Sequence, residues 1–288
     1  MSKLHRILVA VDFSAPARAA FDRAVALSRK HDAKLLVVHA VPTDRAFNWE
    51  GKERAVLMAS LRRAAHAAGV RPAISIQQGD PAAVILLHAN SRGADLIVMG
   101  TNERSMFERF RFGSVAETVT RRATQPVLVV PVGNTGSSEL TAPAAFTNIL
   151  VAVDLSETSR TAIERALAIA GEHGRVTVLH VVPGMAHAGA SRYMYRLMEP
   201  EYQRQLARDA RQQIAAMIPH QARSSRTVQV RIATGDPSAE ISRVAAAIDA
   251  DIIVIGATTR GAIGRRLMPS TAARVMRASE VPVLAAAA

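Results

Sequence analysis

Two places in this chain combine a carboxylate with a nearby hydroxyl at the end of a short apolar run. Asp12 is followed two residues later by Ser14, and Asp154 by Ser156. Such an acid can accept hydrogen bonds from a ligand, or it can act only as the turn or capping residue of a following helix, where Asp and Ser are common. The spacing alone leaves both interpretations open.

A second segment has the composition of an anion-binding loop. It runs from Gly100 to the pair Gly113 and Ser114, which opens a stretch with helical spacing. The start of a helix presents backbone N–H groups and the positive end of the helix dipole, so this segment could receive a phosphate group.

Arginines in the same segment are candidate side-chain partners of that anion. Arg104 and Arg109 lie within it, and Arg260 and Arg265 hold matching positions further along the chain. A guanidinium group can bind phosphate through two parallel hydrogen bonds. Because arginine is abundant in this chain, a solvent-exposed loop face is the alternative interpretation.

The elements that must position these residues are short strands alternating with helices. Ile7–Val11, Leu35–Val41 and Leu96–Met99 are apolar and strand-like, and apolar residues recur at helical spacing from Ala17 to Val25. Pro81, after a Gly-Asp pair, suits the first turn of a helix. Uninterrupted apolar strands separated by helices indicate a parallel sheet covered on both faces, with ligand sites at the carboxyl ends of its strands. We therefore expect a doubly wound α/β fold.

The same alternation occurs twice because the chain contains an internal repeat. Ile7–Ser14 returns as Ile149–Ser156, Gly79-Asp80-Pro81 as Gly235-Asp236-Pro237, Ala94–Gly100 as Ala250–Gly256, and Gln125–Leu128 as Val281–Leu284. We expect two tandem doubly wound parallel-sheet domains, at residues 1–134 and 146–288. A linker marked by Gly, Ser and Pro would join them at residues 135–145.

These repeated landmarks resemble the universal stress protein family, and nearly the whole chain looks like two such domains in tandem. Nucleotide-binding members of that family carry G-x-x-G-x9-G-[ST] after the fourth strand and an acid at the end of the first strand. The resemblance implies a stress-response protein that binds an adenine nucleotide, ATP with or without magnesium. It also implies Rossmann-like domains that form an internal pseudo-dimer, in which Pro126–Val132 would meet Val281–Ala285. Whether two chains also form a homodimer is left open.

The resemblance also assigns residues to a nucleotide site. In the first domain Asp12 would contact ribose or adenine, Val41 would contact adenine through its backbone, and Gly79 would line the adenine pocket. Arg104 would contact phosphate. The residues that would surround the ribose and phosphates are Met99, Gly100, Gly113, Ser114 and Val115. In the second domain Asp154, Val182, Gly235, Gly256 and Ser270 would remain from a degenerate site.

Neither copy carries the complete family signature. The first copy has Glu103 in place of the second glycine but keeps Gly113 and Ser114, whereas the second has Thr259 and then Pro269 before Ser270. Pro269 lacks a backbone N–H and fixes φ, which removes a phosphate donor. Glu103 adds a carboxylate where phosphate would lie. We therefore expect the first domain to hold the nucleotide and the second to be degenerate.

Two other function classes compete with nucleotide binding. The protein could act as a scaffold through protein or small-ligand contacts, using the inserted segment Met185–Met198, which is rich in Met and Tyr. That segment could equally form a lid, or only a longer start of the next helix. The net charge of +12 makes nucleic-acid binding a further alternative. Against it, the charge is spread over both copies and no nucleic-acid-binding motif is present.

Composition argues against several further classes. The absence of cysteine excludes disulfides, thiolate zinc sites and a Cys nucleophile. No paired-histidine zinc motif, G-x-S-x-G or Walker A sequence is present in a suitable context, so we expect no metal site and at most slow ATP hydrolysis. His39 and His180, both in second strands, are expected to be structural. The short apolar runs and the absence of a signal-peptide core lead us to expect a cytoplasmic protein.

Overall fold

The structure is a computed structural model that describes residues 4–43, 52–101, 113–131, 146–183, 200–220, 222, 227–257 and 271–287. It divides into two compact units, residues 2–144 and 145–288, called here the first and second domains. The predicted linker, the inserted segment, Glu103, Arg104, Pro269 and Ser270 lie outside the described residues. The predicted linker boundaries and the expected pairing of the domains therefore stay predictions.

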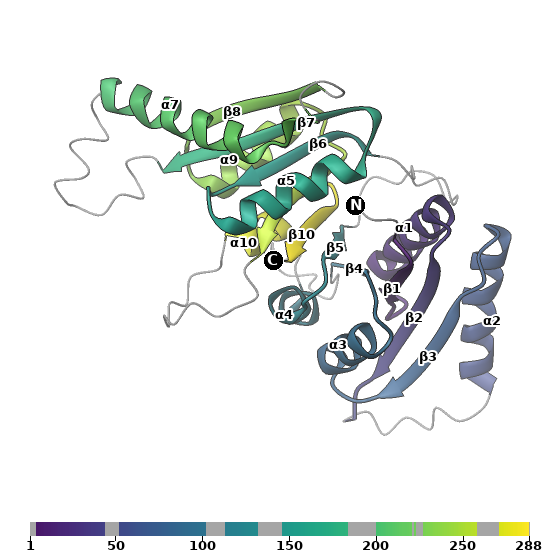
Figure 1. Cartoon of the computed structure of the whole chain (residues 1–288). Coiled ribbons are helices and arrows are strands. Elements are labelled where there is room, and N and C mark those ends of the chain that lie inside the picture. Colours follow the sequence, from purple (N-terminus) through teal and green to yellow (C-terminus); the bar gives the residue numbers. More distant parts are fainter. Residues whose placement is uncertain are drawn as a thin grey trace. The chain divides into compact units, whose positions relative to one another are not determined.

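The first domain is a parallel sheet with strand order β3-β2-β1-β4-β5. Its strands are β1 (Arg6–Ala10), β2 (Lys34–Val41), β3 (Ala73–Gln78), β4 (Leu96–Gly100) and β5 (Val127–Val130). Its helices are α1 (Ala15–His31), α2 (Lys52–Ala67), α3 (Pro81–Ser91) and α4 (Ser114–Arg122). Figure 1 shows α1 and α2 on one face of this sheet and α3 and α4 on the other.

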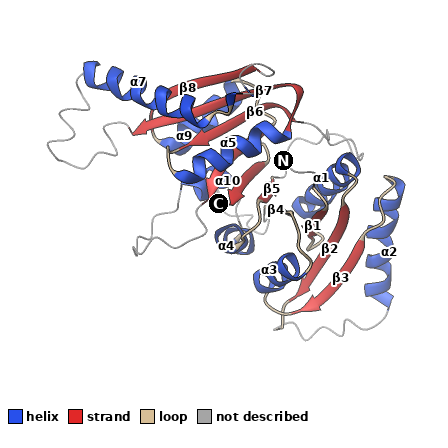
Figure 2. Ribbon diagram, in the orientation of Figure 1, coloured by secondary structure: helices blue, strands red, loops and turns tan. Residues whose placement is uncertain are grey.

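The second domain repeats this plan with strand order β10-β9-β6-β7-β8. Its strands are β6 (Phe146–Val153), β7 (Ala170–Pro183), β8 (Thr227–Gly235), β9 (Ile252–Ala257) and β10 (Val283–Ala287). Its helices are α5 (Glu157–Ile169), α7 (Pro200–Met217), α9 (Pro237–Ala247) and α10 (Thr271–Ala278). In both domains strands alternate with helices along the chain (Figure 2), which confirms the predicted doubly wound α/β fold.

The core follows the apolar pattern of the sequence. Ile7, Leu8 and Val9 of β1 are completely buried, as expected for a central strand covered on both faces. The helical stripe predicted from Ala17 to Val25 is the buried face of α1. In the second domain α5 ends at Ile169, and Ala170 begins β7. Gly171 follows it, and glycine is a poor helix former.

Two of the repeated aspartates hold strand ends together. The carboxylate of Asp95 accepts hydrogen bonds from the backbone N–H groups of His5 (2.7 Å) and Arg6 (2.8 Å). Asp251 does the same for Thr147 (2.6 Å) and Asn148 (3.2 Å). Each aspartate thus ties the start of the fourth strand of its domain to the start of the first.

The repeated Gly-Asp-Pro segments form the turns that begin α3 and α9. Asp80 and Asp236 are N-caps, and each carboxylate accepts a hydrogen bond from the backbone N–H three residues later, at 2.8 and 2.9 Å. The proline that follows is the first helical residue in both helices, as predicted. Gly79 and Gly235 both have φ of +150°, a conformation that other residues rarely adopt.

No helix in the described parts of the chain is both long enough and apolar enough to cross a membrane.

Candidate functional site

A cavity of about 240 Å³ lies at the carboxyl ends of β1, β2 and β4 in the first domain. The starts of α3 and α4 complete its wall. The chain leaves β1 toward β2 on one side, whereas β4 lies on the other, so this is the point where the strand order changes direction. Ligand sites of open parallel sheets are found at such switch points.

Five residues that the sequence predicted for the nucleotide site line this cavity. They are Asp12, Met99, Gly100, Gly113 and Val115. They come from β4, from the residues that follow β1, and from the beginning of α4, so they are far apart in the sequence. The fold brings them together at one edge of the sheet.

Three other predicted residues lie beside the cavity without lining it. Ser114 is the first residue of α4, between two lining residues. The side chain of Val41 is buried, and its carbonyl oxygen accepts a hydrogen bond from the N–H of Gly79 (2.9 Å). The neighbours of Val41, Ala40 and Pro42, line the cavity instead.

Several lining residues were not predicted for the site. They extend the predicted positions into consecutive runs at the strand ends: Ala10 and Val11 precede Asp12, and Thr101 follows Gly100. Val38, His39, Ala40 and Pro42 line the cavity from β2 and the residue after it, and Ala17 and Ile85 from two helices. Their place at the carboxyl ends of β1, β2 and β4 was a signal that could have found these residues, because ligand sites of open parallel sheets lie there.

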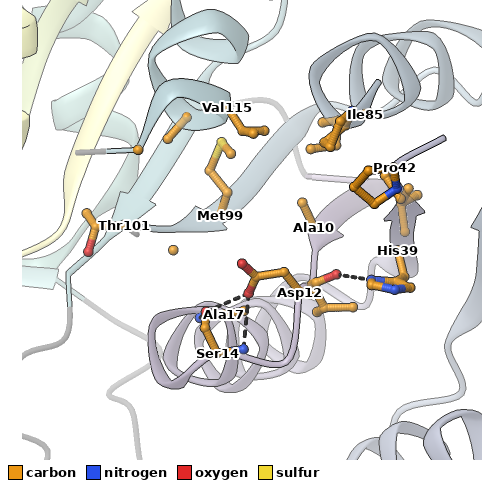
Figure 3. A pocket seen from close by; sticks show the side chains of 17 residues that line it. Ala10, Asp12, Ser14, Ala17, His39, Pro42, Ile85, Met99, Thr101 and Val115 are labelled. Atoms are coloured by element: carbon orange, nitrogen blue, oxygen red, sulfur yellow. Dashed lines mark hydrogen bonds between the residues drawn. The ribbon is translucent and has the colours of Figure 1, made fainter. Parts of the chain in front are cut away.

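One of the two carboxylate oxygens of Asp12 accepts hydrogen bonds from the protein. Its Oδ1 atom accepts hydrogen bonds from the backbone N–H of Ser14 (3.1 Å) and from the Ser14 hydroxyl (2.5 Å). Within the part of the chain that the structure describes, its Oδ2 atom has no hydrogen-bond partner. Figure 3 shows the carboxyl group of Asp12 between Ser14 and Met99. One acceptor atom is therefore available to a ligand.

The matching acid of the second domain is more fully engaged. Asp154 Oδ1 accepts from the N–H and hydroxyl of Ser156 (3.1 and 2.5 Å) and also from the hydroxyl of Ser159 (2.8 Å). Ala17 holds the position of Ser159 in the first domain. Burial by itself would raise the pKa of Asp154, but these hydrogen bonds outweigh it and hold the pKa below its usual value.

A histidine supports the strand end in front of each acid. Nδ1 of His39 lies 2.7 Å from the carbonyl oxygen of Val11, and Nδ1 of His180 lies 2.9 Å from that of Val153. A carbonyl oxygen only accepts, so each Nδ1 carries the donated proton. The structural role predicted for both histidines is confirmed, and His39 also lines the cavity.

The residue after each acid has an uncommon backbone conformation. Phe13 and Leu155 both have φ of +66°, in the left-handed region that large side chains rarely adopt. The ring of Phe13 meets the ring of His39 edge to face, with centroids 4.8 Å apart. This tight turn lets the chain pass from the acid directly into the first helix of the domain.

Gly100 and Gly256 allow that helix to approach the sheet closely. A Cβ atom at Gly100 would lie 2.5 Å from the carbonyl oxygen of Pro16, and one at Gly256 would lie 2.7 Å from Thr158 Oγ1. Both distances are shorter than real Cβ contacts. These glycines therefore have a packing role whether or not they contact a ligand.

The first turn of α4 offers hydrogen-bond donors to the cavity. The first hydrogen bond of the helix runs from Glu117 N to Gly113 O (2.9 Å), so the N–H groups of residues 114–116 have no acceptor inside the helix. Gly113, as N-cap, supplies no side chain to them. Val115 and Ala116 line the cavity. This arrangement suits a bound anion.

The described residues contain no cluster of side chains suited to a metal ion. No group of three or more His, Asp or Glu side chains there could hold a metal ion. Asp12 is the single carboxylate among the described residues that line the cavity. The arrangement therefore suits binding of a small molecule with an apolar part, hydroxyl groups and an anionic part.

Comparison with known proteins identifies one family in both halves of the chain. The model of the universal stress protein family matches residues 3–131 and again residues 145–286. A universal stress protein of Staphylococcus aureus (strain USA300) is 36% identical over 136 residues, covering 43% of this chain and 82% of the relative.

Two solved structures share the fold over nearly the whole length of the chain. A universal stress protein from Archaeoglobus fulgidus DSM 4304 has a TM-score of 0.68 at 20% identity and covers 97% of each chain. A structure from Pseudomonas aeruginosa UCBPP-PA14 has a TM-score of 0.66 at 20% identity, covering 98% of this chain and 92% of that one. A universal stress protein from Archaeoglobus fulgidus, solved in complex with dAMP, covers 45% of this chain at 24% identity, with a TM-score of 0.37.

Proposed function

Because this chain belongs to the universal stress protein family, we propose that it is a stress-response protein whose first domain binds ATP. The observation that carries the proposal is the cavity at the carboxyl ends of β1, β2 and β4. It combines an apolar end, an available carboxylate oxygen and the donor end of a helix.

The apolar end of the cavity suits an adenine ring. Ala10, Pro42 and Ile85 gather on one side of the cavity in Figure 3, and Ala40 also lines it. Small side chains at two of these positions leave room for a flat ring between apolar walls. We expect adenine to lie here, close to the backbone of β2 near Val41.

The carboxylate of Asp12 suits the ribose. Its Oδ1 atom is held by Ser14, which fixes the direction of Oδ2. A carboxylate oxygen is an acceptor only, so it would receive a hydrogen bond from a ribose hydroxyl. Met99 and Gly100 would form the adjacent wall.

The N-terminus of α4 suits the phosphates. The donors of residues 114–116, with the helix dipole, would receive the phosphate oxygens, and Gly113 leaves them accessible. Ser114 and Arg104 are proposed as further phosphate contacts. The phosphates would supply most ligands of a magnesium ion, because the described lining contributes one carboxylate.

We further propose that the second domain is degenerate as a nucleotide site. Strand registers pair Ala10 with Val38 and Ala152 with Leu179, so Leu179 and Val181 replace Val38 and Ala40 with bulkier side chains. Pro269, just before α10, stands where the first domain has Gly113 just before α4. Asp154, Val182, Gly235, Gly256 and Ser270 would remain without a nucleotide.

The direct test is the nucleotide content of the purified full chain. Protein prepared without added nucleotide is denatured, the released ATP, ADP and AMP are quantified, and the stripped protein is titrated with ATP and magnesium by calorimetry. We expect one site per chain. Absence of both bound nucleotide and a titration signal would contradict the proposal and favour the scaffold function.

A matched pair of variants assigns the site to one domain. In Asp12→Asn, Oδ1 still accepts from Ser14 while the ligand acceptor becomes an amide donor, so we expect the Kd for ATP to rise by about tenfold or more. Asp154→Asn, the same change at the matching position, should leave the Kd unchanged. Equal losses in both variants would show that the second domain also binds, and no loss in Asp12→Asn would remove Asp12 from the site.

A further inference from the structure

Thr101 follows β4 directly and lines the cavity of the first domain. Its backbone N–H donates to the carbonyl oxygen of Val130 (3.1 Å), which continues the pairing of β4 with β5 by one residue. Its position is therefore set by the sheet. Neither the family signature nor the sequence analysis assigned it a role.

The side chain of Thr101 is buried but its hydroxyl is not engaged. The residue is only 5% exposed, and the hydroxyl has no hydrogen-bond partner in the part of the chain that the structure describes. The hydroxyl oxygen is not one of the fully enclosed atoms without a partner in the described residues, so it is open to the cavity that the residue lines. A hydroxyl held in a buried residue and open to a cavity can donate to a group that enters the cavity.

The face of the strand shows which part of the cavity Thr101 reaches. Side chains alternate along a strand, and at Gly100 a Cβ atom would meet Pro16 of α1. Met99 and Thr101 therefore lie on the opposite face, the one that α3 and α4 cover (Figure 1). Figure 3 shows Thr101 at one side of the cavity, with His39 and Pro42 at the other. Thr101 is thus at the end away from the proposed adenine position.

The matching position of the second domain has lost the hydroxyl. Ala257 follows Gly256 where Thr101 follows Gly100. The same domain has Pro269 where the first has Gly113. The hydroxyl and the helix-start glycine are present together in one domain and absent together in the other, as expected if both serve the same part of a ligand.

We propose that Thr101 Oγ1 donates a hydrogen bond to a phosphate group seated at the N-terminus of α4. This inference rests on the proposed function, and it makes Thr101 a binding residue that favours phosphorylated nucleotides over the nucleoside. A phosphate oxygen is an anionic acceptor, and hydrogen bonds to charged groups are stronger than neutral ones.

The test compares Thr101→Val with Thr101→Ser and the wild type in calorimetric titrations with ATP, AMP and adenosine. Valine keeps the shape and removes the donor, so the Kd for ATP and AMP should rise about tenfold or more, while that for adenosine stays within about twofold. Serine keeps the hydroxyl and should recover most of the lost affinity. Thr124→Val is the control, because Thr124 is exposed and its hydroxyl bonds Asn90 Oδ1 (3.4 Å) outside the cavity.

The outcomes separate this inference from the proposed function. A wild type without ATP binding defeats the proposed function. A wild type that binds, with Thr101→Val binding equally well, overturns only the role of Thr101. Equal proportional losses for ATP and adenosine would move the contact to the nucleoside and also overturn the inference. If adenosine binds neither protein, the ATP and AMP results decide. Urea unfolding verifies the fold of each variant, and Thr101→Ala replaces the valine variant should that fail to fold.

Discussion

Asp12 and Asp154 hold matching positions in the two domains but accept different numbers of hydrogen bonds, because one neighbouring residue differs. Asp12 and Asp154 each accept two hydrogen bonds from the serine two residues later. Ser159 adds a third donor to Asp154, whereas Ala17 adds none to Asp12. The identity of a residue on the following helix thus decides how many hydrogen bonds hold Oδ1 of the carboxylate, whereas Oδ2 has no hydrogen-bond partner in the described residues of either domain.

Exchange of one lining residue between the domains tests the importance of space in the cavity. Ala40→Val introduces the residue of the second domain, and the added methyl groups should crowd the proposed adenine position and weaken ATP binding by about tenfold. Val181→Ala makes the reverse change in the second domain and should leave ATP binding unaltered. Titration calorimetry of both variants checks this, and an unchanged Kd in Ala40→Val would place adenine elsewhere.

Gly100 illustrates a residue with a packing role that could be mistaken for a binding role. Gly100→Ala would place a Cβ atom against the Pro16 backbone, which cannot easily move, and should lower the free energy of unfolding by roughly 1–3 kcal/mol. Gly256→Ala meets the Thr158 side chain first and should cost less. Urea unfolding of the two variants measures the difference. The reverse order would mean that α1 adjusts more easily than α5.

The helices α3 and α9 begin in the same way in the two domains, but the start of α9 carries an additional ion pair. Asp236, the N-cap of α9, accepts hydrogen bonds from Ser238 Oγ (2.7 Å) and from Arg274 Nη2 of α10 (2.8 Å). The Ser238 hydroxyl, the backbone N–H of Ala239 and the Arg274 guanidinium together lower the pKa of Asp236 to about 2, although burial opposes them. This carboxylate links the starts of two helices in the second domain.

The lowered pKa of Asp236 predicts a stability contribution that acid removes. Its ordinary pKa is 3.8, so the contribution is complete above that pH and is lost as the pH falls through about 2. Asp236→Asn keeps the Oδ1 acceptor of the cap but does not titrate. We expect its Tm to lie below that of the wild type at pH 6, and the gap to shrink between about pH 4 and pH 2 in thermal unfolding. A gap that stays constant over this range would contradict the prediction.

The whole molecule is a duplication in which both copies keep the fold, and we propose that only the first keeps the nucleotide site. Each domain retains its parallel sheet, its aspartate at the strand start and its capped helix. These features stabilise the fold and do not require a ligand. Substitutions at the carboxyl ends of the strands, such as Ala257 in place of Thr101, can alter binding without loss of the core.

ATP should therefore protect one domain of the intact chain. In hydrogen exchange followed by mass spectrometry, added ATP with magnesium should slow exchange in peptides covering residues 10–17, 96–101 and 113–122. Peptides covering residues 152–159 and 252–257 are the internal control and should not change. Equal protection of both sets would indicate two nucleotide sites per chain.

The sequence by itself determined the architecture of this protein. Periodicity and turn residues are local signals, so the strands around Ile7 and Leu96, the stripe from Ala17 to Val25 and the proline at the start of α3 were all predicted correctly. The internal repeat determined that the fold occurs twice. Asp12 and Gly113 were also singled out, because an acid at a strand end and a glycine at a helix start stand out in such a pattern, and the resemblance to the family added Met99.

Only the tertiary structure decided which neighbours of these residues face the cavity. Ala40 lines it while Val41 is turned into the core, and Thr101 presents its hydroxyl to the cavity on the same face as Met99. Residues next to one another at the ends of β1, β2 and β4 line the cavity together, and which of them do so depends on the helices packed against each side of the sheet. The hydroxyl of Ser159 likewise meets Asp154 only because a helix turn folds back on the end of the strand. Contacts of this kind join residues whose proximity no local pattern records.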